Sequence, residues 1–371
     1  MARARSAARG RSRAGYPAAD LRARAAAWQG KHVAVRGLGL STYDVLRGLT
    51  MGQGGRFDAA GYHASGREPC RILPFSLNGQ PPFPKPQAAG FDALFDPTSE
   101  ETTGFSEAAI AAVDAGPEAA PSLISDALLP VVARILAPQN VRVTEIADWL
   151  NVEWSDPGAQ DQLPPMKALR HGIELAAGEV APSIGYTLGQ VWRKWQDTWR
   201  AAFNPRDASP QTAKRLIDFD EGLKRYSYGP HLASARELLA LIDAGLVDLS
   251  FATNPEITNS AQGWTLQAEG HAAEVSVIVD AVLPAPNLSS IAAPPLPDLI
   301  SQGLLSQLSS DLAAATAPDG TLRAPDGRPV PGLCLLGRLA LGSVTAVDSL
   351  HDCFGQSAGR WAQCVIDRLS V

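Results

Sequence analysis

Two glycines follow a short apolar run near the start of the chain, at the spacing of a phosphate-binding turn. Residues 33–35 form this run, Arg36 follows, and Gly37 and Gly39 come next. In such a turn the first glycine permits a tight bend, and the second lets the backbone approach a diphosphate held by the amides of a following helix. The pattern indicates dinucleotide binding, a chemistry that needs backbone amides more than charged side chains.

The residues after the second glycine predict the helix that this chemistry requires. Large apolar or aromatic side chains recur at positions 40, 43, 46 and 49, which gives the helix one face to lay on a sheet. The usual third glycine is replaced by a threonine, which is small enough for close packing of helix on strand. The alternative is an ordinary strand-turn-helix whose glycines only make the turn. The predicted cofactor contacts here are Gly37, Gly39, Leu40 and Thr42.

Composition narrows the class of protein. The 371 residues carry a net charge of −6, which argues against general binding to nucleic acid or an anionic membrane. No apolar run reaches the roughly 18 residues of a membrane span, which argues against a membrane protein. The four cysteines show no CxxC spacing and the six histidines are scattered, so we expect no disulfide framework and no metal site. These features predict a cytoplasmic protein.

Composition also divides the chain into four parts. Residues 1–28 read as an Arg-rich tail and linker, because the first fifteen hold five arginines and no acid. A misassigned upstream start, a disordered tail or a mitochondrial-type presequence would each explain this. Residues 29–100 are the nucleotide-binding segment, 101–250 a helical insertion or lid, and 251–371 the strands and helix that complete the fold.

Three further segments predict how the nucleotide domain is built. Gly52–Pro69 reads as a glycine-rich hairpin before a second strand at Arg71–Leu77. In dinucleotide folds an acid at the end of this second strand favours NAD and an arginine favours NADP, but here the strand ends in Ser-Leu-Asn-Gly. Val275–Leu283 and Leu333–Gly337 read as buried strands, and Gly337 is a further predicted cofactor contact.

The helical middle of the chain carries one broad aromatic stripe, which we expect to face a core. Its members recur at intervals of three and four: Ile184, Leu188, Val191, Trp192, Trp195, Trp199 and Phe203.

Several segments together resemble a bacterial FAD/NAD(P)-binding flavoprotein family that includes urate hydroxylases and amino-acid N-monooxygenases of the aspartate type. They are VAVRGLGLSTYDVLRGLTMGQGGRF, SGREP at Ser65–Pro69, RYSYGPHLASARELLALIDAGLVDL, VIVDAVLPAPN and VPGLCLLGRLALGSVTAVDSL. The resemblance implies an α/β fold: a Rossmann-like three-layer nucleotide-binding domain with a large helical insertion. It also implies hydride transfer from NAD(P)H to FAD and a small-molecule substrate. Arg67, within SGREP, is a further candidate for a phosphate.

The chain departs from this family pattern where a flavin would bind. No glycine motif for FAD precedes His32, Leu77 stands where the family has an arginine, and Arg338 occupies the position of an aspartate that holds the flavin side chain. Asp348 is the nearest later acid. We therefore expect FAD to be held mainly by a missing or separately encoded part, and we name no catalytic residue. The alternative is a non-catalytic truncated remnant or a regulatory nucleotide-binding module.

Overall fold

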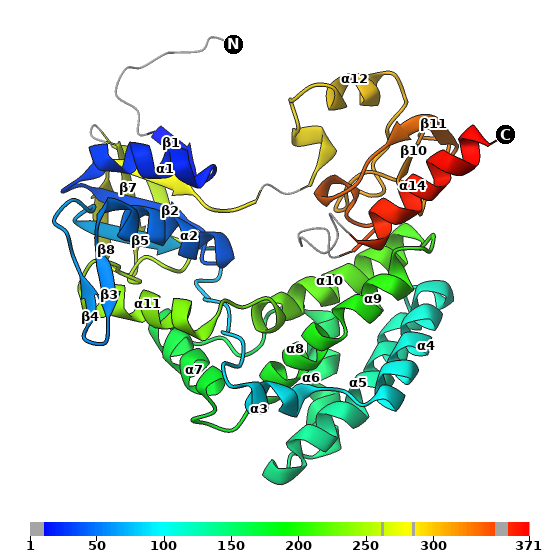
Figure 1. The fold of residues 1–371 in the computed structure, drawn as a ribbon, viewed down its shortest axis with the longest axis horizontal. Coiled ribbons are helices and arrows are strands. Elements are labelled where there is room, and N and C mark those ends of the chain that lie inside the picture. Colours follow the sequence, from blue (N-terminus) through cyan, green and yellow to red (C-terminus); the bar gives the residue numbers. More distant parts are fainter. Residues whose placement is uncertain (1–10, 261–262, 284–285, 346–354, 371) are drawn as a thin grey trace. The chain divides into compact units, whose positions relative to one another are not determined.

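The computed structural model describes residues 11–260, 263–283, 286–345 and 355–370, and the chain forms two compact units (Figure 1). Among these residues the first unit takes in those up to 93, 161–182 and 224–283, and the second takes in 94–160, 183–223 and those from 286 onward. Each unit is therefore assembled from segments far apart in the sequence. Neither unit coincides with the four consecutive parts expected from composition.

The first unit contains short strands and helices from all three of its segments. Its elements are β1 (Arg11–Ala14), α1 (Ala18–Ala25), η1 (Ala26–Trp28), β2 (His32–Arg36), α2 (Leu40–Leu49), η2 (Met51–Gln53), β3 (Arg56–Asp58), β4 (Gly61–His63), β5 (Arg71–Phe75), α3 (Ala89–Asp92), α7 (Pro165–Ala177), α11 (Leu232–Asp243), β6 (Glu256–Ser260), β7 (Gly263–Ala268), β8 (His271–Val275) and β9 (Val277–Asp280).

Four parallel strands form the central sheet of this unit, in the order β1-β9-β2-β5. Strand β2 contains the predicted apolar run, and its three central residues are completely buried between two layers. The predicted hairpin is also confirmed, as β3 pairs antiparallel with β4. The fold is α/β with a parallel sheet, as the sequence indicated.

Alternate side chains of the strands pack against different layers. Val33 and Val35 belong to a core with α1, α2, α7 and α11, whereas Ala34 and Leu73 face residues of the antiparallel sheet β6-β7-β8. The unit therefore has three layers, with helices on one face of the parallel sheet and a second sheet on the other (Figure 1). Helices α7 and α11, expected in a separate insertion, join this core because Leu169 and Leu238 are buried in it.

The expectation that residues 1–28 form only a tail and linker was wrong for the part that is described. Strand β1 pairs with β9 through backbone hydrogen bonds. Because β1 is the edge strand of the sheet, its polar side chains do not prevent this pairing. Helix α1 follows and buries Leu21 and Ala25 under the sheet. A pairing partner more than 250 residues away leaves no trace in the local sequence.

The second unit is mostly helical, with a small β-structure near its C-terminal end. Its elements are α4 (Ser99–Ala115), α5 (Ala120–Leu136), η4 (Ala137–Gln139), α6 (Val143–Ser155), α8 (Ile184–Lys194), α9 (Gln196–Phe203), the first part of α10 (Pro210–Ser227), η5 (Leu288–Ser290), α12 (Leu296–Ser301), β10 (Thr321–Arg323), β11 (Pro329–Cys334), η6 (Arg338–Ala340) and α14 (Gln356–Leu369); the short η3 (Ala93–Phe95) lies at the boundary between the units.

The predicted aromatic stripe lies in the core of the second unit. Trp192, Trp195 and Trp199 are each at most 1% exposed, and they make edge-on, stacked and tilted contacts with neighbouring rings of the same unit. Trp192 also donates a hydrogen bond of 2.6 Å to the buried carboxylate of Asp220. The stripe is a core face, as expected.

One segment of the second unit passes a test for a membrane span by length and composition alone. It is Ala120–Gln139, which consists of α5 and η4. This finding corrects the expectation that no segment is long and apolar enough to cross a membrane. Ile124, Leu128 and Val131 within it are completely buried, as in the core helix of a soluble protein.

Leu333–Gly337 was predicted as a buried strand of the nucleotide domain, and this prediction was wrong. Strand β11 ends at Cys334 and pairs antiparallel with β10 in a separate two-stranded sheet of the second unit. Two prolines and a glycine interrupt it, and its side chains are exposed or half-buried.

Three cysteines are described as free thiols. Cys353 and Asp348 lie outside the described residues.

Candidate functional site

The turn after β2 requires a glycine at its first position. Gly37 has φ +125°, and its N–H donates to the Phe75 carbonyl at 2.7 Å. A Cβ placed on it would come within 3.2 Å of the Thr42 hydroxyl and 3.3 Å of a Val282 methyl. The backbone conformation favours glycine here, and a larger residue would also require its neighbours to shift.

The second glycine of the turn, in contrast, faces open space. Gly39 is the N-cap of α2, and a Cβ on it would meet nothing within 4 Å. In the described part of the chain no side chain hydrogen-bonds the amides of Leu40 and Ser41, which begin the helix. Unpaired amides and the positive end of the helix dipole favour an anion at this point.

Thr42 carries a second unsatisfied group beside this turn. The residue is 2% exposed, and among the described residues its hydroxyl has no hydrogen-bond partner. That hydroxyl lies against the backbone of Gly37. A buried hydroxyl without a partner is costly.

The ends of β1 and β9 lie beside the same turn. Gly15 N–H donates to the Asp280 carbonyl at 2.9 Å, and α2 approaches so closely that a Cβ on Gly15 would lie 2.9 Å from a Val45 methyl. Tyr16, the next residue, is 46% exposed and donates its hydroxyl to Asp44 at 2.7 Å. Burial, and then this hydrogen bond, raise the pKa of Tyr16, so the hydroxyl keeps its proton.

An ion pair joins the ends of β2 and β9. Arg36 and Asp280 are directly opposite each other in the parallel register, and their side chains approach to 3.0 Å. Asp280 also accepts the amide of Val282 at 3.1 Å. The pair therefore fixes the loop that closes over Gly37, although it is partly exposed and adds little stability.

The end of β5 carries no charge that would select a cofactor. Ser76 and Asn78 fold back on the loop, where Gly79 N–H donates to the Ser76 hydroxyl at 3.0 Å. Leu77 between them is 85% exposed. The position that distinguishes NAD from NADP in dinucleotide folds thus has neither an acid nor an arginine.

The structure does not bring Arg67 to the other predicted contacts. Gly30 and Lys31, just before β2, are hydrogen-bonded to Glu68 and Cys70, so this loop lies at the amino ends of the strands. Gly37 lies at the carboxyl ends. Arg67 is exposed and packs over Gly54, with no contact to the Gly37 turn.

Gly337 is likewise placed elsewhere. It belongs to the second unit and is the N-cap of the short η6, with φ +82° and open space around its Cβ position. It follows a two-stranded antiparallel sheet and not a strand of the parallel sheet. The predicted cofactor contacts that the structure gathers are therefore Gly37, Gly39, Leu40 and Thr42.

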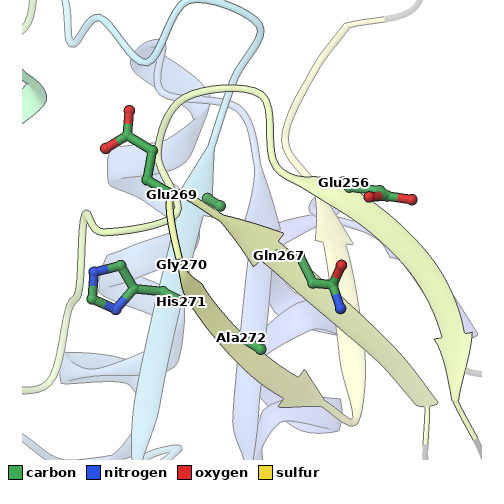
Figure 2. Close-up of a pocket in the computed structure, with 7 residues that line it drawn as sticks. Glu256, Gln267, Glu269, Gly270, His271 and Ala272 are labelled. Carbon is green, nitrogen blue, oxygen red and sulfur yellow. The ribbon is translucent and has the colours of Figure 1, made fainter.

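A hollow of about 430 Å³ lies on the antiparallel sheet of the first unit. Glu256, Glu269 and His271 are among its lining residues, and Figure 2 shows their side chains pointing away from one another. In the described part of the chain, no three acidic, histidine or cysteine side chains are grouped as metal ligands would be. Because its polar groups do not converge, this hollow is a weaker candidate site than the Gly37 turn.

Sequence reasoning missed Gly15, Tyr16 and the Arg36–Asp280 pair. The sequence does contain Gly-Tyr-Pro directly after the short polar segment 11–14, and this combination is typical of a turn. Its importance depends on β1 lying in the sheet, which the polar residues around it concealed.

Comparison with known proteins adds no relative: no family model and no curated protein matches the chain.

Proposed function

We propose that this protein is the NAD(P)H-binding portion of a flavin-dependent oxidoreductase, of the monooxygenase type, in which hydride passes from NAD(P)H to FAD. The observation that carries the proposal is the open position at Gly39, in the turn at the carboxyl end of β2, followed by α2 amides that have no partner among the described residues. Ligands of open α/β sheets bind at this edge. The resemblance of several segments to FAD/NAD(P)-binding flavoproteins is consistent with it.

The dinucleotide fits the residues of this chain through its diphosphate. The amides of Leu40 and Ser41 would hold the phosphate oxygens, and Gly39 would let them approach. The Thr42 hydroxyl would gain a partner. Since the end of β5 has no selecting charge, we expect NADH and NADPH to bind with similar affinity.

The residues of this chain do not fit FAD in the same way. Gly337 follows a separate antiparallel strand, and Arg338 stands where related enzymes hold the flavin with an aspartate. A separately encoded FAD-binding part is the partner we propose, with the protein in the cytoplasm. The flavin would supply the redox chemistry and this chain the binding and orientation of NAD(P)H.

The same observation favours a second function, a regulatory module that binds the nucleotide without catalysis. Such a module would use the Gly37 turn and would need no flavin. The two functions differ only in whether NAD(P)H is oxidised.

Titration of the purified chain with NADH, NADPH and ADP-ribose tests the binding step. Gly39→Glu places a carboxylate at the open turn and should abolish binding, whereas Gly104→Glu is the matched control, because Gly104 in α4 also faces open space. Oxidation of NAD(P)H after adding FAD would favour the oxidoreductase over the module. If the native chain binds none of the three ligands, both proposals are wrong.

A further inference from the structure

The strand order sets the direction in which a bound dinucleotide would run. In dinucleotide folds the strand that follows the glycine turn faces the adenosine ribose, and here that strand is β5, on one side of β2. On the other side lie β9 and then β1. The nicotinamide half of the ligand would therefore extend over the ends of β9 and β1.

One side chain at this end of the sheet, that of Tyr16, is aromatic and held by a hydrogen bond. Tyr16 follows Gly15 at the end of β1, and the Gly15 amide is bonded to Asp280 at the end of β9. The Tyr16 hydroxyl is bonded to Asp44, one helical turn after Leu40 in α2. Because its hydroxyl and the amide of the preceding residue are both hydrogen-bonded, and 46% of the residue is exposed, Tyr16 presents a ring that is held at this end of the sheet.

The chemistry of the ring suits the nicotinamide. Nicotinamide is planar, and its oxidised form carries a positive charge, which is attracted to the face of an aromatic ring. The hydrogen bond to a carboxylate makes the Tyr16 ring more electron-rich, which strengthens this attraction. ADP-ribose has the same diphosphate and adenosine but no nicotinamide, so it would gain nothing from Tyr16.

From this placement we propose that Tyr16 is the platform on which the nicotinamide ring stacks, so that the site binds the oxidised dinucleotide more tightly than ADP-ribose. The inference rests on the proposed dinucleotide binding. The inference adds the orientation of the bound ligand and a residue that favours NAD⁺ over NADH.

The test compares Kd values for NAD⁺, NADH and ADP-ribose in the native chain and in three variants at Tyr16. Tyr16→Ala should weaken NAD⁺ about tenfold, weaken NADH less, and leave ADP-ribose within about twofold. Tyr16→Phe keeps the ring and should stay within about threefold of the native chain for every ligand. Tyr16→Leu keeps an apolar side chain without a π face and should behave like Tyr16→Ala, which guards against poor folding of the alanine variant.

The outcomes separate this inference from the proposed function. Equal weakening of NAD⁺ and ADP-ribose in Tyr16→Ala would show that Tyr16 only positions α2, and the stacking role would be lost. Unchanged NAD⁺ binding in both Tyr16→Ala and Tyr16→Leu would also overturn it. If ADP-ribose does not bind the native chain at all, the failure belongs to the proposed function.

Discussion

Two turns of the first unit each contain two glycines but have opposite surroundings. The turn at Gly54–Gly55 is filled by the chain itself, because Cβ atoms there would lie 2.1 Å from the Arg67 guanidinium and 1.9 Å from the Tyr62 hydroxyl. At Gly39 a Cβ would meet nothing within 4 Å. A glycine whose space is occupied by neighbouring side chains serves packing, whereas a glycine that faces open space at a helix N-terminus is free to serve a ligand.

The filled turn should respond to substitution with the largest loss of stability. Gly55→Ala would push the Tyr62 hydroxyl away from Glu68, a residue that is 5% exposed and whose carboxylate accepts a hydrogen bond from that hydroxyl at 2.7 Å. Leaving a buried carboxylate short of a donor should lower the free energy of unfolding by about 3 kcal/mol. Urea unfolding of the variant and the native chain measures this. A loss below about 1 kcal/mol would mean that Tyr62 moves aside at little cost, and that its side chain does not close the turn.

The same carboxylate should make the filled turn sensitive to acid. Burial alone would raise the pKa of Glu68, but hydrogen bonds from the Ser65 amide and the Tyr62 hydroxyl outweigh it, and the pKa lies below its ordinary value. The stabilisation is therefore present above the unfolded pKa, near 4.3, and is lost as the pH falls through the lower folded value.

Unfolding free energies measured between pH 7 and pH 3 test this sign. Glu68→Gln should lower stability at pH 7 and flatten its decline below about pH 5. Glu107→Gln is the control, since Glu107 is an exposed carboxylate on α4. A decline as steep in Glu68→Gln as in the native chain would assign the acid sensitivity to other groups.

The sequence reveals the features that depend on neighbouring residues, and it does not reveal those that depend on contacts between distant segments of the chain. The bounds of β2, the helix at α2 and the hairpin follow from local patterns of apolar residues and glycines. β1 could not be predicted, because its pairing with β9 is between segments far apart and its own residues are polar. Nor could sequence show which glycine is enclosed, since only folding brings Tyr62 and Glu68 against Gly55.

The open turn should give the reverse response, with binding lost and stability kept. Gly39 has φ −79°, which alanine adopts easily, so Gly39→Ala should change the free energy of unfolding by less than about 0.5 kcal/mol. The added methyl would occupy the space that a diphosphate needs and should weaken NADH about tenfold or more. Gly104→Ala is the matched control and should leave NADH binding unchanged. A large loss of stability in Gly39→Ala would show that this turn is also closed.

Thr42 should show only a small effect on stability, and it tests whether the open turn offers more than backbone amides. Thr42→Val keeps the shape of the side chain and removes a buried hydroxyl that has no partner among the described residues. Since no hydrogen bond is lost, the free energy of unfolding should change by less than about 1 kcal/mol. If the hydroxyl gains the diphosphate as a partner, NADH should bind about tenfold more weakly to Thr42→Val, whereas Thr42→Ser should bind normally. Equal binding by all three proteins would limit the site to the amides of the turn, and a substantial loss of stability in Thr42→Val would show that the hydroxyl is already satisfied within the fold.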